Sequence, residues 1–141
     1  MKMPEEIELP RPLSNQLLHL AQQSSVEEIC GLVGARDGVP TTCYPVRNVA
    51  RSPKHHFQMD PREQIGAMKA MRAQNEQLFG IYHSHPDSSA RPSREDLEQA
   101  AYPEALYLII SLNTKGVLEM RGFRLTENKE VQDVTLLLKH D

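Results

Sequence analysis

The sequence lacks the features that would place the chain in a membrane or in an oxidising compartment. No stretch approaches the roughly 18 apolar residues of a membrane-spanning helix, and the N-terminal stretch MKMPEEIELPRPLSNQ has no apolar signal-peptide core. Its two cysteines, Cys30 and Cys43, form neither a disulfide framework nor a CxxC metal pair. We therefore expect a cytoplasmic protein whose cysteines are small buried hydrophobes.

A surplus of one charge is also missing. The 16 basic and 19 acidic side chains give a net charge of −3, and the basic ones are scattered along the chain. Binding to nucleic acid or to an anionic membrane surface is therefore not expected. No repeat, low-complexity tract or linker interrupts the sequence, so residues 1–141 are expected to form a single domain.

Helices and strands are mixed along the chain. Short apolar runs bounded by turn residues predict strands at EEICGLVGAR, TTCYPVRNV, LFGIYHSH, ALYLIISL, VLEMRGFRL and VQDVTLLL, with a shorter one at HHFQMD. Helices are expected after a Ser14 cap, from Asp60-Pro61 to about Gln77, and over 93–101. Gly38 and NTKG fall where turns would join strands. This order predicts an α+β fold.

The most informative short motif is His83-Ser84-His85, at the end of a predicted strand. Side chains alternate faces along a strand, so the two histidines share one face and Ser84 points to the other. Two imidazoles on one face can bind one metal ion, and Zn²⁺ favours nitrogen ligands. Alone, the motif is weak evidence, because most such pairs are ordinary surface residues.

Asp96 is placed to supply a third ligand. Pro86 and Pro92 bracket a loop that can turn the chain back, which puts Asp96 in the first turn of the next helix. Ser93-x-x-Asp96 also fits a capping box, which would stabilise the helix with no chemistry at all. The histidines upstream favour the metal interpretation. Three protein ligands leave a fourth position for water, as in catalytic zinc sites.

Water activated by a metal needs a base, and two carboxylates precede a neighbouring strand. Glu28 opens the run EICGLVG, whereas Glu27 would point to the opposite face, so only one of them can serve.

These motifs together resemble the JAMM (MPN+) zinc metalloprotease family. The H-x-H-x(7)-S-x-x-D core is complete at His83, His85, Ser93 and Asp96. The family's E-x-C-G-L block aligns on Glu28, which selects it over its neighbour.

The resemblance runs from about Leu13 to Leu112. Within it, VRNVARSPKHHFQMDP resembles the family's connecting segment, in which an Asn such as Asn48 recurs. The resemblance implies a single MPN/JAMM domain of class α+β. Its mixed, partly curled central sheet would be flanked by two or three helices, in a cytidine-deaminase-like α/β/α arrangement.

The resemblance also implies a role for each motif residue. His83, His85 and Asp96 would hold one zinc ion per chain. Glu28 would act as general base and then general acid, and Ser93 would donate a hydrogen bond to the oxyanion. Water would attack directly, without a covalent intermediate.

JAMM enzymes cleave amide or isopeptide bonds after the C-terminal Gly-Gly of ubiquitin-like proteins. The short chain resembles stand-alone prokaryotic members, so the expected partner is a ubiquitin-like sulfur-carrier protein. The carrier's tail is expected to pair with the strand that ends at His83, and Asn48 and the 86–92 loop are candidate groove walls. Exposed edge strands allow a homodimer.

A catalytically silent MPN scaffold is the main alternative, although such domains typically lack one or more ligands. A zinc nucleobase deaminase is excluded, because the H-x-E and P-C-x-x-C motifs are absent. A DNA-associated relative is disfavoured by the near-neutral charge. His55 and His56 are adjacent, and we expect solvent or loop packing for both.

Overall fold

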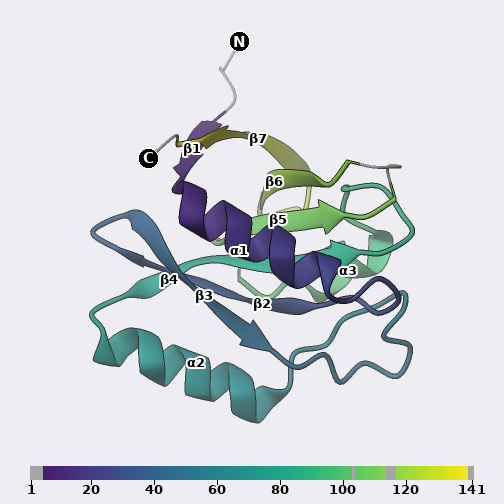
Figure 1. Ribbon diagram of the computed structural model, residues 1–141, viewed down its shortest axis with the longest axis horizontal. Helices are drawn as coiled ribbons and strands as arrows, with labels where there is room; N and C mark the ends of the chain where they lie inside the picture. The colour runs from purple at the N-terminus through teal and green to yellow at the C-terminus, as the bar shows by residue number, and fades with distance from the viewer. Residues whose placement is uncertain (1–4, 103, 114–116, 140–141) are drawn as a thin grey trace.

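The computed structural model describes residues 5–102, 104–113 and 117–139. In this part of the chain seven strands form one mixed sheet, and three helices pack against it (Figure 1). The elements, in chain order, are β1 (Glu5–Leu9), α1 (Arg11–Gln22), β2 (Cys30–Arg36), β3 (Val39–Val46), α2 (Pro61–Ala73), β4 (Gln77–His85), α3 (Arg94–Gln99), β5 (Leu106–Ser111), β6 (Glu119–Leu125) and β7 (Val131–Leu138). The predicted α+β class is confirmed.

The sheet has the order β1-β7-β6-β5-β4-β2-β3. β4 runs parallel to β5, and β1 runs parallel to β7, whereas the other neighbours are antiparallel. In Figure 1, β6 and β7 bend away from the plane of β2, β3 and β4, so the sheet is partly curled as expected. β4 is an inner strand, hydrogen-bonded to β2 on one side and to β5 on the other.

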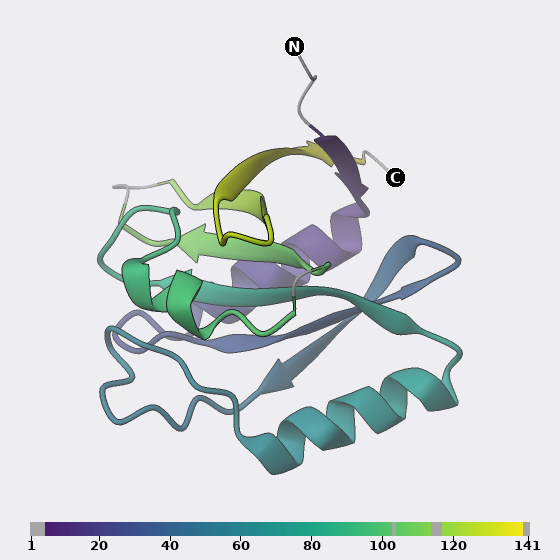
Figure 2. The ribbon, with the colours of Figure 1, turned by 180° about the vertical axis from the view of Figure 1, so that it is seen from behind.

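Two hydrophobic layers cover the two faces of the sheet. α1 packs on one face with a core that includes Leu17, Tyr82 and Leu108. α2 packs on the other face with a core that includes Ile81 and Ile109, and Figure 2 brings α2 and α3 to the front. Tyr82 and Ile81 are adjacent on β4 but lie in different layers. The alternation along β4 therefore puts His83 on the α2 side and Ser84 on the α1 side.

α1 begins earlier than expected. Its N-cap is Pro10, without a side-chain hydrogen bond, and the next proline lies in the first turn. Ser14 is buried inside the helix and does not cap it. The Ser14 prediction is wrong because proline is tolerated in the first turn, where its missing N–H needs no partner.

α2 begins as predicted, and its end differs. The Asp60 side chain accepts a hydrogen bond from the Arg62 N–H, and Pro61 is the first helical residue. The helix ends at Ala73, several residues before the predicted end near 77, and its Ile65 side chain is 57% exposed. None of the helices in the described ranges is long and apolar enough to cross a bilayer.

The turn between β2 and β3 matches its prediction. Asp37 and Gly38 have φ values of 53° and 80°, as a two-residue hairpin turn requires. The short strand expected at HHFQMD is absent from the described chain, where the segment makes one isolated bridge, between Asn48 and Met59. The other predicted strands are present. The turn predicted at NTKG lies mostly outside the described residues.

Gly31 of β2 has no room for a side chain. A Cβ atom at Gly31 would collide with the hydroxyl of Tyr82 and the carbonyl of Tyr44. We expect Gly31→Ala to lower the free energy of unfolding by about 1–3 kcal/mol, because a packed core cannot absorb added volume. Chemical denaturation measures this loss. The control is Gly66→Ala in α2, where a Cβ meets nothing within 4 Å and the helix should gain about 0.5–1 kcal/mol. Equal stability of the two variants would contradict this packing.

Candidate metal centre

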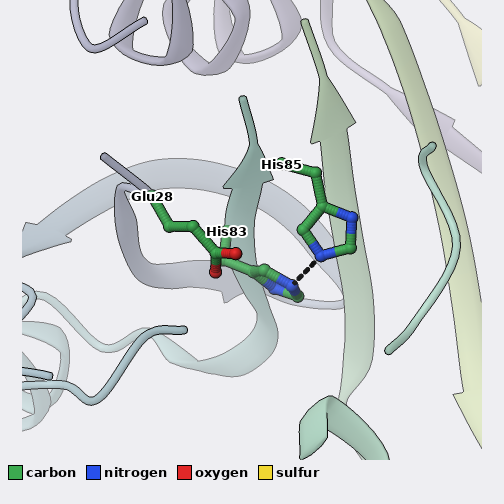
Figure 3. Close-up of side chains that lie close together, drawn as sticks. All are labelled: Glu28, His83 and His85. Atoms are coloured by element: carbon green, nitrogen blue, oxygen red, sulfur yellow. Dashed lines mark hydrogen bonds between the residues drawn. The ribbon is translucent and has the colours of Figure 1, made fainter. Parts of the chain in front are cut away.

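The two histidines of the HSH motif meet at the C-terminal end of β4. His83 and His85 are 2% and 3% exposed, and their Nε2 atoms are 3.1 Å apart. Figure 3 shows the two rings joined by this contact, with the carboxylate of Glu28 pointing toward the ring of His83. The two histidines therefore lie on one face of β4, as their spacing predicts.

Asp96 completes a triangle with the histidines. Its Oδ2 atom lies 3.1 Å from the Nε2 atom of His83 and 3.1 Å from that of His85. The capping box is also present. The Ser93 N–H donates to the same Oδ2 at 2.8 Å, and the Ser93 hydroxyl oxygen accepts from the Asp96 N–H at 3.0 Å. The Asp96 carboxylate is thus both the helix cap and the candidate metal ligand. The first turn of α3 holds it in place.

The three converging atoms fit a tetrahedral metal site. Bonds of about 2.0–2.1 Å to zinc would separate neighbouring ligand atoms by about 3.3 Å, close to the 3.1 Å observed for all three pairs. The Nδ1 atom of His85 donates to the Ser89 carbonyl at 2.7 Å, which leaves the lone pair on its Nε2 atom facing the triangle. Burial lowers the pKa of His83, which favours the neutral form that a ligand needs.

The charge state of Asp96 also suits a ligand. Burial alone would raise the pKa of this carboxyl. The adjacent His83 and His85 side chains and the hydrogen bond from the Ser93 N–H outweigh that effect and hold its pKa well below the usual range. The carboxylate is therefore anionic throughout the physiological range.

Glu28 lies beside the triangle, on the segment that leads into β2. It is 5% exposed, whereas Glu27 is exposed. One carboxylate oxygen lies within 4.8 Å of ring nitrogens of His83 and His85. Burial raises the pKa of Glu28 to about 8, although the nearby His85 opposes this rise. Its Oε1 atom has no hydrogen-bond partner among the described residues.

A second buried carboxylate shows that burial alone does not produce this state. Glu76 is 4% exposed, and it accepts hydrogen bonds from the hydroxyls of Thr41, Thr42 and Tyr44. Burial pushes its pKa upward, but these donors lower it below the ordinary value. Glu76 is therefore satisfied, whereas Glu28 keeps an unpartnered oxygen next to the histidines. Such a perturbed carboxyl group is typical of a reactive site.

Asn48 does not point freely into the site. Its Nδ2 atom donates to the carbonyls of Glu28 and His56, both at 2.9 Å. Its Oδ1 atom accepts from the N–H groups of Ala50 and Gln58, both at 3.0 Å. The side-chain amide is therefore fully engaged with main-chain groups on both sides.

Sequence reasoning missed two contacts made by the 50–58 loop. The ring of Phe57 stacks on His83 with centroids 4.3 Å apart. The Nδ1 atom of His56 lies 2.7 Å from a carboxylate oxygen of Glu95, in the first turn of α3. The loop therefore packs over the histidines. No periodic pattern identifies these residues, because the loop has no regular structure.

A cavity of about 460 Å³ opens beside the triangle. His83 and Asp96 lie in its lining, and the remaining walls carry no charged side chain. Those walls are formed by Phe57, Gln58, Met59, Pro61, Gln64, Ile81, Gln99, Ala100, Ala101, Tyr102 and Tyr107.

The expected pairing of a substrate tail with β4 is wrong. From Gly80 to His85, β4 is paired with β5 on one side, and it is paired with β2 on the other as far as His83. No edge of the strand is free at the site. An edge is instead offered at Met59. The bridge to Asn48 is closed by hydrogen bonds of Gln58 and Asp60, so the N–H and C=O of Met59 point the other way.

A family model described as prokaryotic homologs of the JAB domain matches residues 10–125. A "Desampylase" of Haloferax volcanii is 40% identical over 86 residues, which make up 60% of this chain and 62% of that protein. The chain thus spans less than two thirds of that relative. A "CysO-cysteine peptidase" of Mycobacterium tuberculosis is 30% identical over 123 residues, covering 86% of this chain and 84% of that protein. A "Probable TtuB-protein conjugate cleaving protease" of Thermus thermophilus is 35% identical over 129 residues, covering 91% and 82%.

Solved structures show the same fold. A protein from Desulfitobacterium hafniense, solved in solution, superposes with a TM-score of 0.84 at 38% identity, covering 95% of this chain and 93% of that one. A JAB1/MPN domain protein from Archaeoglobus fulgidus gives a TM-score of 0.55 at 18% identity, covering 93% of this chain and 99% of that one. The predicted MPN fold is confirmed.

The raised pKa of Glu28 predicts a pH-dependent cost to stability in the metal-free protein. Between its ordinary value of 4.5 and about 8, the folded state holds a proton that the unfolded chain has released. Wild-type stability should therefore fall as the pH rises through this window. At pH 9, Glu28→Gln should raise the free energy of unfolding by on the order of 2 kcal/mol. Near pH 4.5 the two proteins should be nearly equally stable.

Urea titrations in the presence of a chelator, at both pH values, measure this difference. Glu27→Gln is the matched control, because this exposed neighbour should show no such pH-dependent gain. If Glu28→Gln raised the free energy of unfolding equally at both pH values, the stability cost would not come from ionisation of the buried Glu28 carboxyl group.

Proposed function

Because this chain belongs to the family of prokaryotic homologs of the JAB domain, we propose that it hydrolyses the amide bond after the C-terminal Gly-Gly of a ubiquitin-like or sulfur-carrier protein. The relatives named as a desampylase, a peptidase and a protease support the prediction of a JAMM-type hydrolase of peptide or isopeptide bonds. Two of their names, CysO-cysteine peptidase and TtuB-protein conjugate cleaving protease, support a protein conjugate as the substrate.

The observation that carries the proposal is the convergence of Asp96 with both histidines beside a buried Glu28. His83, His85 and Asp96 would hold one zinc ion per chain. Zinc bound there would supply a Lewis acid that polarises the scissile carbonyl and lowers the pKa of a bound water. Glu28 also has an oxygen near the histidines, but the closer, anionic Asp96 is the better third ligand.

Glu28 is the general base of this proposal. It takes a proton from the attacking water and then gives it to the leaving amine, so the group ends each cycle as it began. A base is most effective when its pKa lies near the working pH, and burial brings the pKa of Glu28 to about 8. The carboxylate oxygen that lacks a partner is available to receive the proton.

Ser93 would stabilise the negative charge that develops on the carbonyl oxygen. Its hydroxyl oxygen accepts the Asp96 N–H, and this leaves the O–H free to donate. One such donor typically contributes a few kcal/mol to the transition state.

The carrier tail would lie in the cavity lined by Phe57 and Met59. The outward N–H and C=O of Met59 can pair with an extended tail, which would add one strand to the bridge at Asn48. Glycines suit this position, since they let two backbones approach closely. Asn48, the candidate groove wall, would contribute by holding this segment in place.

We propose one domain over 1–141, since a single sheet carries both core layers. The cytoplasmic location and the homodimer stay predictions.

The direct test uses ubiquitin-like carriers extended past Gly-Gly by a cysteine or by a lysine-linked peptide. The wild type should cleave after Gly-Gly, as mass spectrometry would show, and a tail ending in Ala-Ala should resist. Glu28→Gln should lose about 10²–10⁴-fold in rate, with zinc still present by elemental analysis. Chelation should abolish activity, and added Zn²⁺ should restore it.

Glu27→Gln serves as the control and should cleave like the wild type. Full activity of Glu28→Gln would rule out the proposed base. A wild type that purifies without metal and cleaves none of these carriers would favour the silent scaffold.

A further inference from the structure

Glu28 lies outside regular structure, although the proposed mechanism needs its carboxylate in one place. β2 begins only at Cys30. The two residues before it are held by individual hydrogen bonds. The Glu28 N–H donates to the Pro53 carbonyl at 2.7 Å, and the Glu28 carbonyl accepts from the Asn48 side chain at 2.9 Å.

Ser84 holds the next residue along. The Ser84 N–H donates to the Ile29 carbonyl at 3.0 Å, and the Ser84 hydroxyl oxygen accepts the Ile29 N–H at 2.9 Å. Ser84 is fully buried on the α1 side of the sheet, away from the metal face. A hydroxyl thus continues the pairing of β2 with β4 beyond the Cys30–His83 pair.

Asn48 ties the same segment to the loop above the site. One of its N–H groups goes to the Glu28 carbonyl and the other to the His56 carbonyl. The neighbouring Phe57 stacks on His83. Movement of Asn48 would therefore displace the base and the loop together.

We propose that Ser84 and Asn48 are positioning residues that hold the Glu28 carboxylate against the metal site, an inference that rests on the proposed function. Neither side chain touches the converging ligand atoms. Both act through the main chain of residues 28 and 29. Without these two side chains, the main chain of Glu28 keeps one hydrogen bond, from its N–H to the Pro53 carbonyl. A displacement of about 1 Å can cost about 10²-fold in rate.

The test compares Ser84→Ala with Ser84→Thr on the Gly-Gly–cysteine carrier. Ser84→Ala should lower kcat by about 10-fold to 10²-fold, with KM and zinc content unchanged. Ser84→Thr keeps the hydroxyl and should recover most of kcat. Ser14→Ala is the matched control, because Ser14 is a buried serine of α1 whose hydroxyl has no partner among the described residues.

A double-mutant cycle separates positioning from general loosening. If Ser84 acts through Glu28, adding Ser84→Ala to Glu28→Gln should cost no further activity. The same loss in both backgrounds would overturn the inference. Asn48→Asp keeps the acceptor and removes the donors to both Glu28 and His56. Its loss should therefore be smaller in the Glu28→Gln background than in the wild type, and an equal loss in both would overturn the role of Asn48.

Hydrogen exchange at the Ile29 amide gives a readout that needs no substrate. Exchange should quicken in Ser84→Ala and return to the wild-type rate in Ser84→Thr, and an unchanged rate in Ser84→Ala would overturn the contact. If the wild type cleaves but Ser84→Ala and Asn48→Asp match it, this inference fails alone. If the wild type cleaves no carrier, the proposed function is wrong. The positioning role of Ser84 in catalysis is then wrong as well.

Discussion

The carboxylate of Asp96 is the constraint on which the arrangement of the site depends. Its Oδ2 atom accepts the Ser93 N–H that starts α3, and the same atom faces both histidine Nε2 atoms. A helix cap normally stabilises a helix by about 1 kcal/mol. Here the cap also fixes the position of an anion between two buried imidazoles. The start of a six-residue helix is thereby coupled to the end of a strand.

Glu28 differs from the other buried carboxyl groups in how its oxygens are satisfied. Hydroxyl donors satisfy Glu76, whereas the Ser93 N–H and two close imidazoles stabilise the Asp96 carboxylate. Glu28 has an unpartnered oxygen and a pKa of about 8. Such a group costs stability whenever it is ionised. A fold tolerates this cost where the proton affinity is useful, because a base poised near neutral pH can take a proton and release it again.

Local rules predicted most of the site's geometry. Alternation along a strand placed His83 and His85 on one face, and the cap signal placed Asp96 in the first turn of α3. The same kind of reasoning failed for Ser14, since a run of prolines can start a helix without a capping side chain.

Contacts between segments far apart in the chain escaped prediction. The stacking of Phe57 and the hydroxyl of Ser84 depend on how β2, β4 and the 50–58 loop come together. The inner position of β4 depends on the order of strands in the sheet. No spacing rule encodes these features, because they arise from tertiary pairing between distant segments.

The inner position of β4 separates metal binding from substrate recognition. A strand paired on both sides holds its ligands rigidly, yet it cannot also pair with a substrate. Recognition must then come from neighbouring segments, and the structure offers the Met59 edge and the cavity beside α3. Met59 and α3 lie outside the sheet, although Ile81 and Tyr107 of the sheet also line the cavity. In the proposed enzyme, substrate choice would therefore depend on segments without a regular sequence pattern, whereas the metal ligands would lie on a strand and a helix cap that the sequence predicts.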